Sequence, residues 1–501
     1  MTHVGTVPST TEESSPVHAG MTWHPGDGRP GWHHGAVISS STPAVLPRRA
    51  VAGYALGSVG TGGFGTLPGL VLAYYLTDTL GVAAGLASLV VTVPKLWDVV
   101  IDPFIGARSD VSAARHGSRR RFLLAGAVTI PLLFAALFAT PAALTGSAAA
   151  VWVVVAFVAA ATAFSVFQVP YIALPAEIAP DYDSRTRLLA PRIAVLAVAI
   201  LAFGAGGPLV RDAAGGGRTG YAVMGVVGGL VIGLGMLAAW WGAPRRAGIA
   251  VPDEAPVAPR PERRGDALRL GLATLRELPA FRRLLATFVL QALATGAMLA
   301  GAQYVATYAL GSEGAVTFLF AALVAPALLV MPLATRLSRR IGKRAALTGA
   351  TTLFAVAALS LLPMRWAPGG WVYLSVALAG VAYAGMQLYP LAMLPDVAAV
   401  DARERGVDRA GVLGGVWTAG ETAGLALGPT LVLGMLAVTG FVSRTGDAVV
   451  EQPASAVTGI VVAFSVLPAA LAFLSLLPLA RYPLSEAVVD ATLDPSQETH
   501  R

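Results

Sequence analysis

Residues 95–103 place three ionisable side chains inside an otherwise apolar stretch of the sequence. Lys95, Asp98 and Asp102 are spaced i, i+3 and i+7, so in a helix they share one face. Two carboxylates one turn apart can hold a cation together or share one proton, because adjacent like charges repel each other. Lys95 can neutralise one of them. A purely structural ion cluster is the alternative, but three charges in one apolar stretch favour a site that binds a cation or a proton.

Other apolar stretches are also interrupted by polar residues. A charge near the centre of a bilayer costs at least ~2.5–3.5 kcal/mol, so each such residue is a candidate for function. We predict that these residues contact a substrate, although hydrogen bonds between helices would explain Gln291 and Gln303 equally well. The predicted substrate-binding residues are Tyr171, Arg192, Gln291, Gln303, Gln387, Trp417 and Glu421.

Charged residues also lie where apolar stretches end. Glu177 and Asp396 follow two similar segments, residues 168–175 and 387–395. We predict that these carboxylates form a gate or pack the helix ends, with Arg119 and Arg409 of the polar loops as gate residues.

The composition indicates that these residues lie in a membrane protein. Of 501 residues, 55% are hydrophobic and 13% are charged, with a mean hydropathy of +0.68, whereas soluble chains carry about 25% charged residues. This excludes a disordered chain, a nucleic-acid binder and most soluble enzymes. The chain has no cysteine and no P-loop, GxSxG or HExxH motif. We therefore expect no enzyme activity, no direct use of ATP, no metal site and no cofactor other than a coupling ion.

Apolar runs separated by short polar breaks repeat along the chain. About 20 helical residues cross a ~30 Å hydrocarbon core, and backbone groups in lipid must be paired within the protein. The sequence therefore predicts an all-α membrane protein with twelve transmembrane helices. The predicted spans are 50–77, 83–107, 120–142, 147–175, 187–210, 219–243, 283–310, 314–337, 343–364, 370–395, 410–440 and 456–480.

The basic residues alternate between the polar breaks. Arginines are dense after the second, fourth, sixth, eighth and tenth spans, and the opposite loops hold only Arg211, Arg218, Arg365 and Arg444. Positive charge marks cytoplasmic loops, so we expect a multi-pass plasma-membrane protein with both termini in the cytoplasm. The net charge of +7 then reflects these loops, and we expect no nucleic-acid partner.

The polar breaks also divide the chain. We predict a disordered cytoplasmic tail over 1–46, a six-helix bundle over 47–243 and a cytoplasmic linker over 244–281. A second bundle follows over 282–482, with a tail over 483–501. The bundles resemble each other, because segments 168–177 and 387–396, and 117–121 and 342–344, match at equivalent positions. A six-plus-six repeat resembles the major-facilitator fold, in which substrate binds between the halves.

Specific motifs add a closer resemblance. Residues 97–106, Asp110 and the basic segment ending at Phe122 resemble the second-helix signature of the glycoside–pentoside–hexuronide:cation symporters, the melibiose-permease-like family. Residues 394–397, Asp401 and Arg409, and the segments 168–171 and 191–192, are similar to that family in position.

The resemblance implies roles for particular residues. Asp98 and Asp102 would bind the coupling cation, Lys95 would match a basic residue of the same helix, and Arg192 would contact sugar. The family's first-helix aspartate falls at Gly62 and a third cation-site aspartate at Gln168. Because an acidic ligand is replaced, the resemblance favours H⁺ over Na⁺, which needs several oxygens at once.

We therefore predict a secondary active transporter that works by alternating access. Its substrate is a small organic solute, sugar- or glycoside-like by resemblance, and its coupling ion is a cation, H⁺ in preference to Na⁺. The alternative is a proton-coupled exporter of a drug-like, secondary-metabolite or lysolipid compound, and a receptor or scaffold is less favoured. We expect a monomer in the lipid bilayer.

Overall fold

The computed structural model describes residues 47–116, 118–178, 182–244, 273–405, 410–445 and 450–484. All of these lie in one compact unit, Val45–Arg501. The predicted tail 1–46, residues 245–272 of the predicted linker and residues 485–501 of the predicted C-terminal tail lie outside the described residues.

Twelve helical segments of the described chain are long and apolar enough to cross a membrane, which confirms the predicted fold class. Most span boundaries agree with the sequence prediction to within a few residues. Two predicted spans were too short: the one placed at 83–107 continues to residue 113, and the one placed at 370–395 continues to residue 405. Both helices continue beyond the apolar stretch into charged residues. A span predicted from hydropathy does not include these charged residues.

The helices follow one another with short connections. α1 and α8 each end in a π-helical turn, η1 (Tyr75–Thr79) and η2 (Val305–Ala309), and the last span is divided at Ser465 into α13 and α14. A 3₁₀ turn, η3 (Leu362–Arg365), follows α10. The helices are α1 (Arg48–Tyr74), α2 (Ala84–His116), α3 (Arg120–Phe138), α4 (Gly146–Ile178), α5 (Tyr182–Ala213), α6 (Gly217–Gly242), α8 (Pro279–Tyr304), α9 (Ala315–Ile341), α10 (Lys343–Leu359), α11 (Trp371–Arg405), α12 (Ala410–Val438), α13 (Ala454–Phe464) and α14 (Val466–Ala480).

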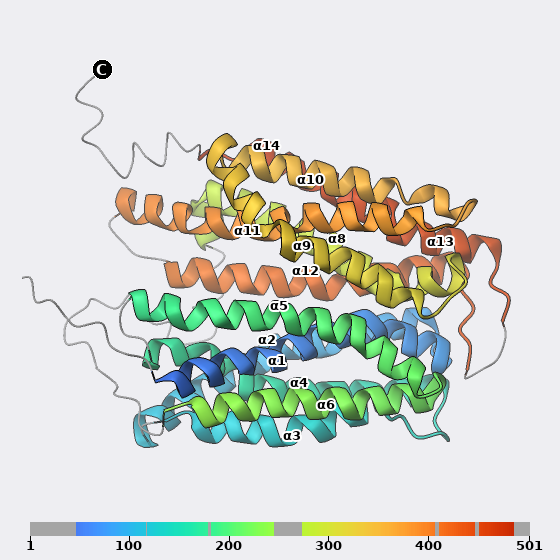
Figure 1. Cartoon of the computed structure of the whole chain (residues 1–501), viewed down its shortest axis with the longest axis horizontal. Coiled ribbons are helices and arrows are strands. Elements are labelled where there is room, and N and C mark those ends of the chain that lie inside the picture. The colour runs from blue at the N-terminus through green and yellow to red at the C-terminus, as the bar shows by residue number, and fades with distance from the viewer. Residues whose placement is uncertain are drawn as a thin grey trace, which may run out of the picture. The chain divides into compact units, whose positions relative to one another are not determined.

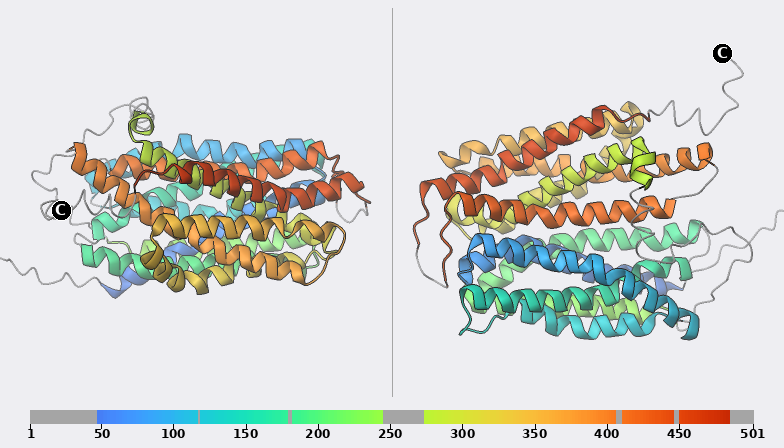
Figure 2. Two further views of the ribbon diagram at one scale, coloured as in Figure 1. Left: turned by 90° about the horizontal axis from the view of Figure 1, so that it is seen from above. Right: turned by 180° about the vertical axis from the view of Figure 1, so that it is seen from behind.

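The helices pack in two groups (Figure 1), and each group contains six of the twelve spans of the described chain. In the first group α1 packs against α5 and α6, and α3 against α4 and α6; in the second, α8 packs against α12 and α14, and α11 against α9 and α10. The groups meet where α2 contacts α12, α5 contacts α9, and α1 contacts α8. The views from above and behind in Figure 2 show the same long, roughly aligned helices. This is the six-plus-six arrangement that the sequence predicted.

Glycines allow the closest helix crossings. A Cβ atom at Gly428 of α12 would lie 2.4 Å from the backbone of Gly296 in α8, and one at Gly53 of α1 would lie 2.7 Å from the Cα of Gly242 in α6. A side chain would therefore separate the backbones. In lipid, where the hydrophobic effect does not drive helix association, such close packing is a main source of stability.

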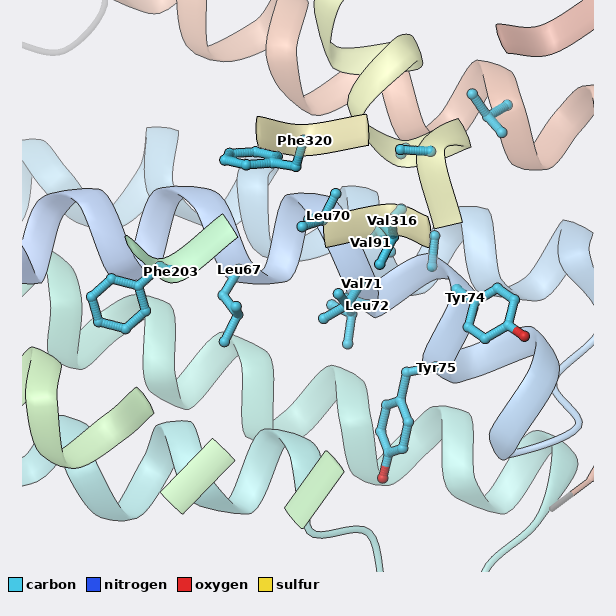
Figure 3. Close-up of a cluster of buried hydrophobic side chains, with 14 of the residues drawn as sticks. Leu67, Leu70, Val71, Leu72, Tyr74, Tyr75, Val91, Phe203, Val316 and Phe320 are labelled. Atoms are coloured by element: carbon cyan, nitrogen blue, oxygen red, sulfur yellow. The ribbon is translucent and has the colours of Figure 1, made fainter. Parts of the chain in front are cut away.

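An apolar core continues from one group into the other (Figure 3). Leu67, Leu70 and Val71 of α1 are fully buried, and Phe320 of α9 packs in the same cluster. The Phe320 ring lies so close to Gly204 of α5 that a Cβ there would be 2.0 Å from it. We call the end of the bundle where α1 ends the Asp78 end, and the end where α1 begins the Arg48 end. These contacts seal the two groups together toward the Asp78 end.

Candidate functional site

A cavity of about 560 Å³ lies between the two groups. Its wall is formed by α1, α2, α4 and α5 on one side and by α8, α9, α11 and α12 on the other. Three predicted site residues line it: Lys95, Gln387 and Glu421. Most of the wall is apolar, and its polar lining residues are Thr61, Thr66, Lys95, Thr295, Tyr383, Gln387, Glu421 and Thr422. A space of this size and lining suits a small amphipathic molecule.

The predicted coupling residues lie together on α2. The Nζ atom of Lys95 lies 3.6 Å from Oδ2 of Asp98, and Lys95 also reaches the cavity wall. One carboxylate oxygen of Asp98 and one of Asp102 are buried without a hydrogen-bond partner in the described chain. A buried, unpaired carboxylate oxygen is costly, and gaining a proton removes most of that cost. The arrangement is therefore able to bind a proton beside the cavity.

Gln168 occupies a position one layer behind the cavity wall. Thr61 of α1, which lines the cavity, donates a 2.8 Å hydrogen bond to Oε1 of Gln168. This contact ties α4 to α1. It gives Gln168 a structural partner from the same group of helices.

Arg192 and Tyr171 lie among α1, α4 and α5 rather than on the described cavity wall. The Arg192 guanidinium carbon lies 5.6 Å from the centre of the Tyr171 ring and 5.8 Å from that of Tyr54. The Tyr171 hydroxyl lies 3.0 Å from the Ser58 hydroxyl, and Nε of Arg192 is buried without a partner in the described chain. The aromatic rings therefore hold the arginine by cation–π contact.

Three other predicted substrate residues also lie away from the cavity. Gln291 is buried in the second group, where its amide donates a 2.8 Å hydrogen bond to Thr351. Trp417 stacks on Phe288, with ring centres 4.3 Å apart. Gln303 belongs to a polar network at the Asp78 end. For Gln291 the structure favours the alternative of a hydrogen bond between helices.

Two of the predicted gate residues, Asp396 and Arg119, have described side chains. Asp396 pairs with Lys343 at 2.6 Å, and Arg119 donates a 3.0 Å hydrogen bond to Ser109. Arg409 and the side chain of Glu177 lie outside the described residues.

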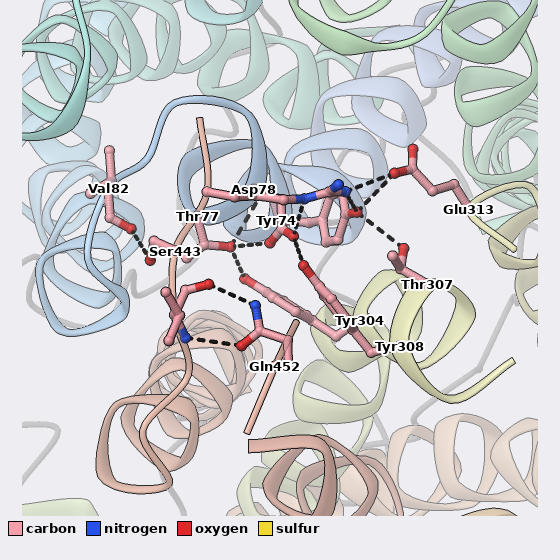
Figure 4. A network of polar contacts seen from close by, with 12 residues as sticks. Tyr74, Thr77, Asp78, Val82, Tyr304, Thr307, Tyr308, Glu313, Ser443 and Gln452 are labelled. Atoms are coloured by element: carbon pink, nitrogen blue, oxygen red, sulfur yellow. Dashed lines mark hydrogen bonds and ion pairs between the residues drawn. The ribbon is translucent and has the colours of Figure 1, made fainter. Parts of the chain in front are cut away.

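A polar network of many described residues lies at the Asp78 end, where Gln303 is the residue that the sequence predicted for a site; Figure 4 shows the contacts around Asp78. Arg444, from the loop after α12, contacts Asp78 at 3.0 Å and Glu313 at 2.9 Å. Its backbone N–H also donates to the Thr77 carbonyl, and Tyr308 donates a hydrogen bond to Asp78. Burial acts to lower the pKa of Arg444, but the neighbouring Tyr74 and Asp78 outweigh it and raise the pKa above its usual range. The arginine therefore stays charged and ties the two groups together.

The same network contains a symmetric pair of contacts. The hydroxyls of Thr77 and Tyr304 lie 2.8 Å apart, and Thr307 donates a 3.1 Å hydrogen bond to Tyr74. Residues 74–81 and 304–311 occupy the same positions after α1 and α8 and share Tyr, Thr, Leu and Gly at matching places. Both segments end in a glycine with positive φ, 69° at Gly81 and 70° at Gly311. The two π turns are thus equivalent, and each contacts the other.

A second arginine extends the network. Arg211 of α5 is 1% exposed and donates a 3.0 Å hydrogen bond to Gln303 of α8. It also pairs with Asp212 at 2.7 Å. In the sequence, Arg211 and Arg444 stand out only as exceptions to the arginine distribution. Their position in the arginine-poor loops, together with the repeated Tyr-x-x-Thr pattern, is the signal that could have identified this network.

Comparisons with known proteins agree with this arrangement. Residues 53–486 match the family described as MFS/sugar transport protein. A segment of 128 residues is 34% identical to the uncharacterized symporter sll1374 of Synechocystis sp., covering 25% of this chain and 24% of that protein. A segment of 147 residues is 27% identical to the glucuronide carrier protein homolog of Escherichia coli, covering 29% of this chain and 32% of that protein. The matched segments thus span about a third or less of these relatives.

A solved structure shows the same fold. The bacterial homologue of the human lysosomal transporter Spinster, in an inward-facing and unoccupied conformation, is similar with a TM-score of 0.62 and 16% identity, over 88% of this chain and 99% of that one. The chain therefore belongs to the MFS/sugar transport protein family of membrane transporters, which confirms the resemblance to cation symporters seen in its sequence.

Proposed function

We propose that this protein is a proton-coupled transporter that moves a glycoside-like solute across the plasma membrane by alternating access. The observation that carries the proposal is the cavity between the two groups, which Lys95 reaches from a helix that also bears two partly unpaired carboxylates. Transporters of this fold hold substrate at the interface of their halves. Thr61, Tyr383, Gln387 and Thr422 offer polar groups to sugar hydroxyls on the cavity wall.

The distribution of arginines indicates which end of the helix bundle faces the cytoplasm. Arg119, Arg120 and Arg344 lie at the Arg48 end, so this end faces the cytoplasm and both termini lie there. The described hydrogen bonds between the groups gather at the Asp78 end. The structure is then an inward-facing state, closed on the outer side.

Asp98 and Asp102 are the coupling residues of this proposal. Each has one buried oxygen that lacks a partner in the described chain, and one proton removes such a charge from the apolar surroundings. Sodium requires several oxygens at once, whereas the side-chain oxygen of Gln168 already accepts a hydrogen bond from Thr61. Protonation would let the loaded carrier reorient, because less charge then crosses the apolar interface.

The proposal is tested by uptake into proteoliposomes that contain the full chain. 4-Nitrophenyl glycosides would be supplied with an imposed pH gradient, with and without sodium. We expect uptake that follows the pH gradient and is lost in Asp98→Asn and Asp102→Asn. Glycoside flux that ignores the pH gradient, or that survives both substitutions, would refute proton coupling. If the protein transports only amphipathic non-sugar compounds, the exporter alternative would replace the proposal.

A further inference from the structure

The described cavity wall carries two charged side chains in different surroundings. Lys95 of α2 lies on one side of the interface and Glu421 of α12 on the other. The positive charge of Lys95 is compensated within its own helix, because Asp98 lies 3.6 Å away and Asp102 follows one turn later. Lys95 therefore has little unbalanced charge to offer a solute.

Glu421 has no comparable partner. It forms no ion pair or hydrogen bond with another residue of the described chain. Thr422, Leu425 and Ala426 line the cavity beside it on α12, and Tyr383 of α11, also on the wall, is close enough to interact with it electrostatically but carries no positive charge. An ionised carboxylate that faces an apolar cavity is costly unless a cation or a proton meets it. This side chain is thus positioned to receive positive charge from whatever fills the cavity.

The other residues of the cavity wall indicate what kind of chemical group the solute carries besides its positive charge. Phe64, Phe157, Phe320 and Leu323 line the cavity from α1, α4 and α9. Aromatic and branched side chains of this kind bind an apolar body, and they make up more of the wall than its polar groups do. A molecule that contacts both Glu421 and the apolar wall therefore has a cationic group and an apolar part.

We infer that Glu421 determines the charge of the substrate, and that the transported solute is an amphipathic glycoside with a protonated amine that pairs with Glu421. This rests on the proposed function and narrows its substrate class. Neutral glycosides bind more weakly than those with a protonated amine. Uronides are disfavoured because their carboxylate is repelled by the carboxylate of Glu421. Glu421 of α12 recognises the charge of the substrate, and Asp98 and Asp102 of α2 bind the coupling proton. The loaded carrier therefore binds one ligand on each of the two groups of helices.

The alternative for Glu421 is a permanently protonated carboxyl that only donates a hydrogen bond. That carboxyl would not distinguish an amine from a hydroxyl of equal shape, whereas an ionised carboxylate would. Close charge pairs at interfaces contribute about 1.5 kcal/mol or more, which corresponds to about tenfold in affinity.

The test compares ligands that differ only in charge. Calorimetry at pH 7 on the purified full chain would use phenyl β-glucoside, 4-(aminomethyl)phenyl β-glucoside and phenyl β-glucuronide, together with the non-sugar pair 4-butylbenzylamine and 4-butylbenzyl alcohol. We expect the aminomethyl glucoside to bind about tenfold more tightly than the neutral one, and the glucuronide to bind most weakly. Glu421→Gln should abolish the difference, and Glu421→Asp should retain a preference for the amine.

Glu404→Gln is the matched control, because Glu404 is an exposed carboxylate at the end of α11. It should keep the wild-type preference. Glucosides that bind without regard to charge, or a preference that survives Glu421→Gln, would overturn the inference and leave the proposed function standing. Binding of the benzylamine alone, dependent on Glu421, would support charge recognition and overturn the glycoside proposal. If none of the five compounds binds, both are wrong.

Discussion

Thr77 and Tyr304 bring their hydroxyls within 2.8 Å of each other across the interface between the two groups of helices. Thr307 and Tyr74 make the same contact with the helices exchanged. Beside these two hydrogen bonds, Arg444 forms ion pairs with Asp78 and Glu313. The Asp78 end is thus closed by hydrogen bonds that are nearly symmetric and by ion pairs that are not.

Removing the symmetric hydrogen bonds should favour opening at this end. A hydrogen bond contributes about 1 kcal/mol, so Tyr304→Phe should raise the open population about fivefold, and Tyr74→Phe/Tyr304→Phe should raise it further. The chain has no cysteine, so Gly65→Cys in the cavity can report opening through its rate of labelling by an impermeant maleimide from outside. Tyr389→Phe, whose hydroxyl bonds Ala334 within the second group, should leave that rate unchanged.

The Asp78–Arg444 pair should behave as a coupled unit. Asp78 is fully buried and Arg444 is 18% exposed, so removing one partner leaves a buried charge unmatched. Arg444→Gln and Asp78→Asn should each lower the free energy of unfolding by about 1–3 kcal/mol. Together they should lower it by less than the sum, as measured by thermal denaturation in detergent. Strictly additive losses would mean that the pair contributes no mutual stabilisation.

Two glutamines provide a matched test of the cavity. Gln387 lines it, whereas Gln291 is buried and bonds Thr351. Gln387→Ala should weaken glycoside affinity several-fold with little change in thermal stability. Gln291→Ala should leave affinity within about twofold but cost about 1–3 kcal/mol of stability, through a lost hydrogen bond and lost packing. The reverse pattern would place the substrate elsewhere.

The glycine crossing of α8 and α12 should be intolerant of side chains. Gly428→Val puts a Cβ 2.4 Å from the α8 backbone, so we expect loss of folded protein in size-exclusion chromatography. Gly434 lies on the same helix with nothing within 4 Å of its Cβ position. Gly434→Val should therefore remain folded, and an equal effect of both substitutions would point to helix propensity instead of packing.

Coupling through α2 should be separable from transport itself. In Asp98→Asn the charge that must be neutralised is gone, so exchange of labelled for unlabelled glycoside should continue while uptake against a gradient stops. Counterflow and pH-driven uptake in the same vesicles would measure the two. Loss of exchange as well would assign Asp98 to substrate binding.

The sequence predicted those parts of the structure that depend on one element at a time. Twelve apolar runs had to become helices in lipid, and the i, i+3, i+7 spacing brought Lys95 to Asp98 because both lie on one helix. Which polar residues face the cavity could not be read in this way. Gln291 and Gln387 sit in similar apolar helices, and only the rotation of each helix against its neighbours separates them.

The Asp78-end network was missed for a related reason. Asp78, Glu313 and Arg444 are far apart in the chain and each lies at the end of an apolar run, where a charge is unremarkable in hydropathy. Their meeting depends on how three loops converge. Hydropathy also ended the second and tenth spans early, since α2 and α11 continue as helices into charged residues.

The reciprocal Tyr–Thr contacts bear on how this chain arose. A contact that a surface makes with its own copy can join two identical subunits about a twofold axis. A six-helix unit with one such turn carries both halves of the contact, so two copies of it can pair as a homodimer. Once two copies are joined in one chain, each is free to diverge alone. Asp78 now faces Tyr308, its own counterpart in the second copy, and one ancestral position has become an acid in one half and a phenol in the other.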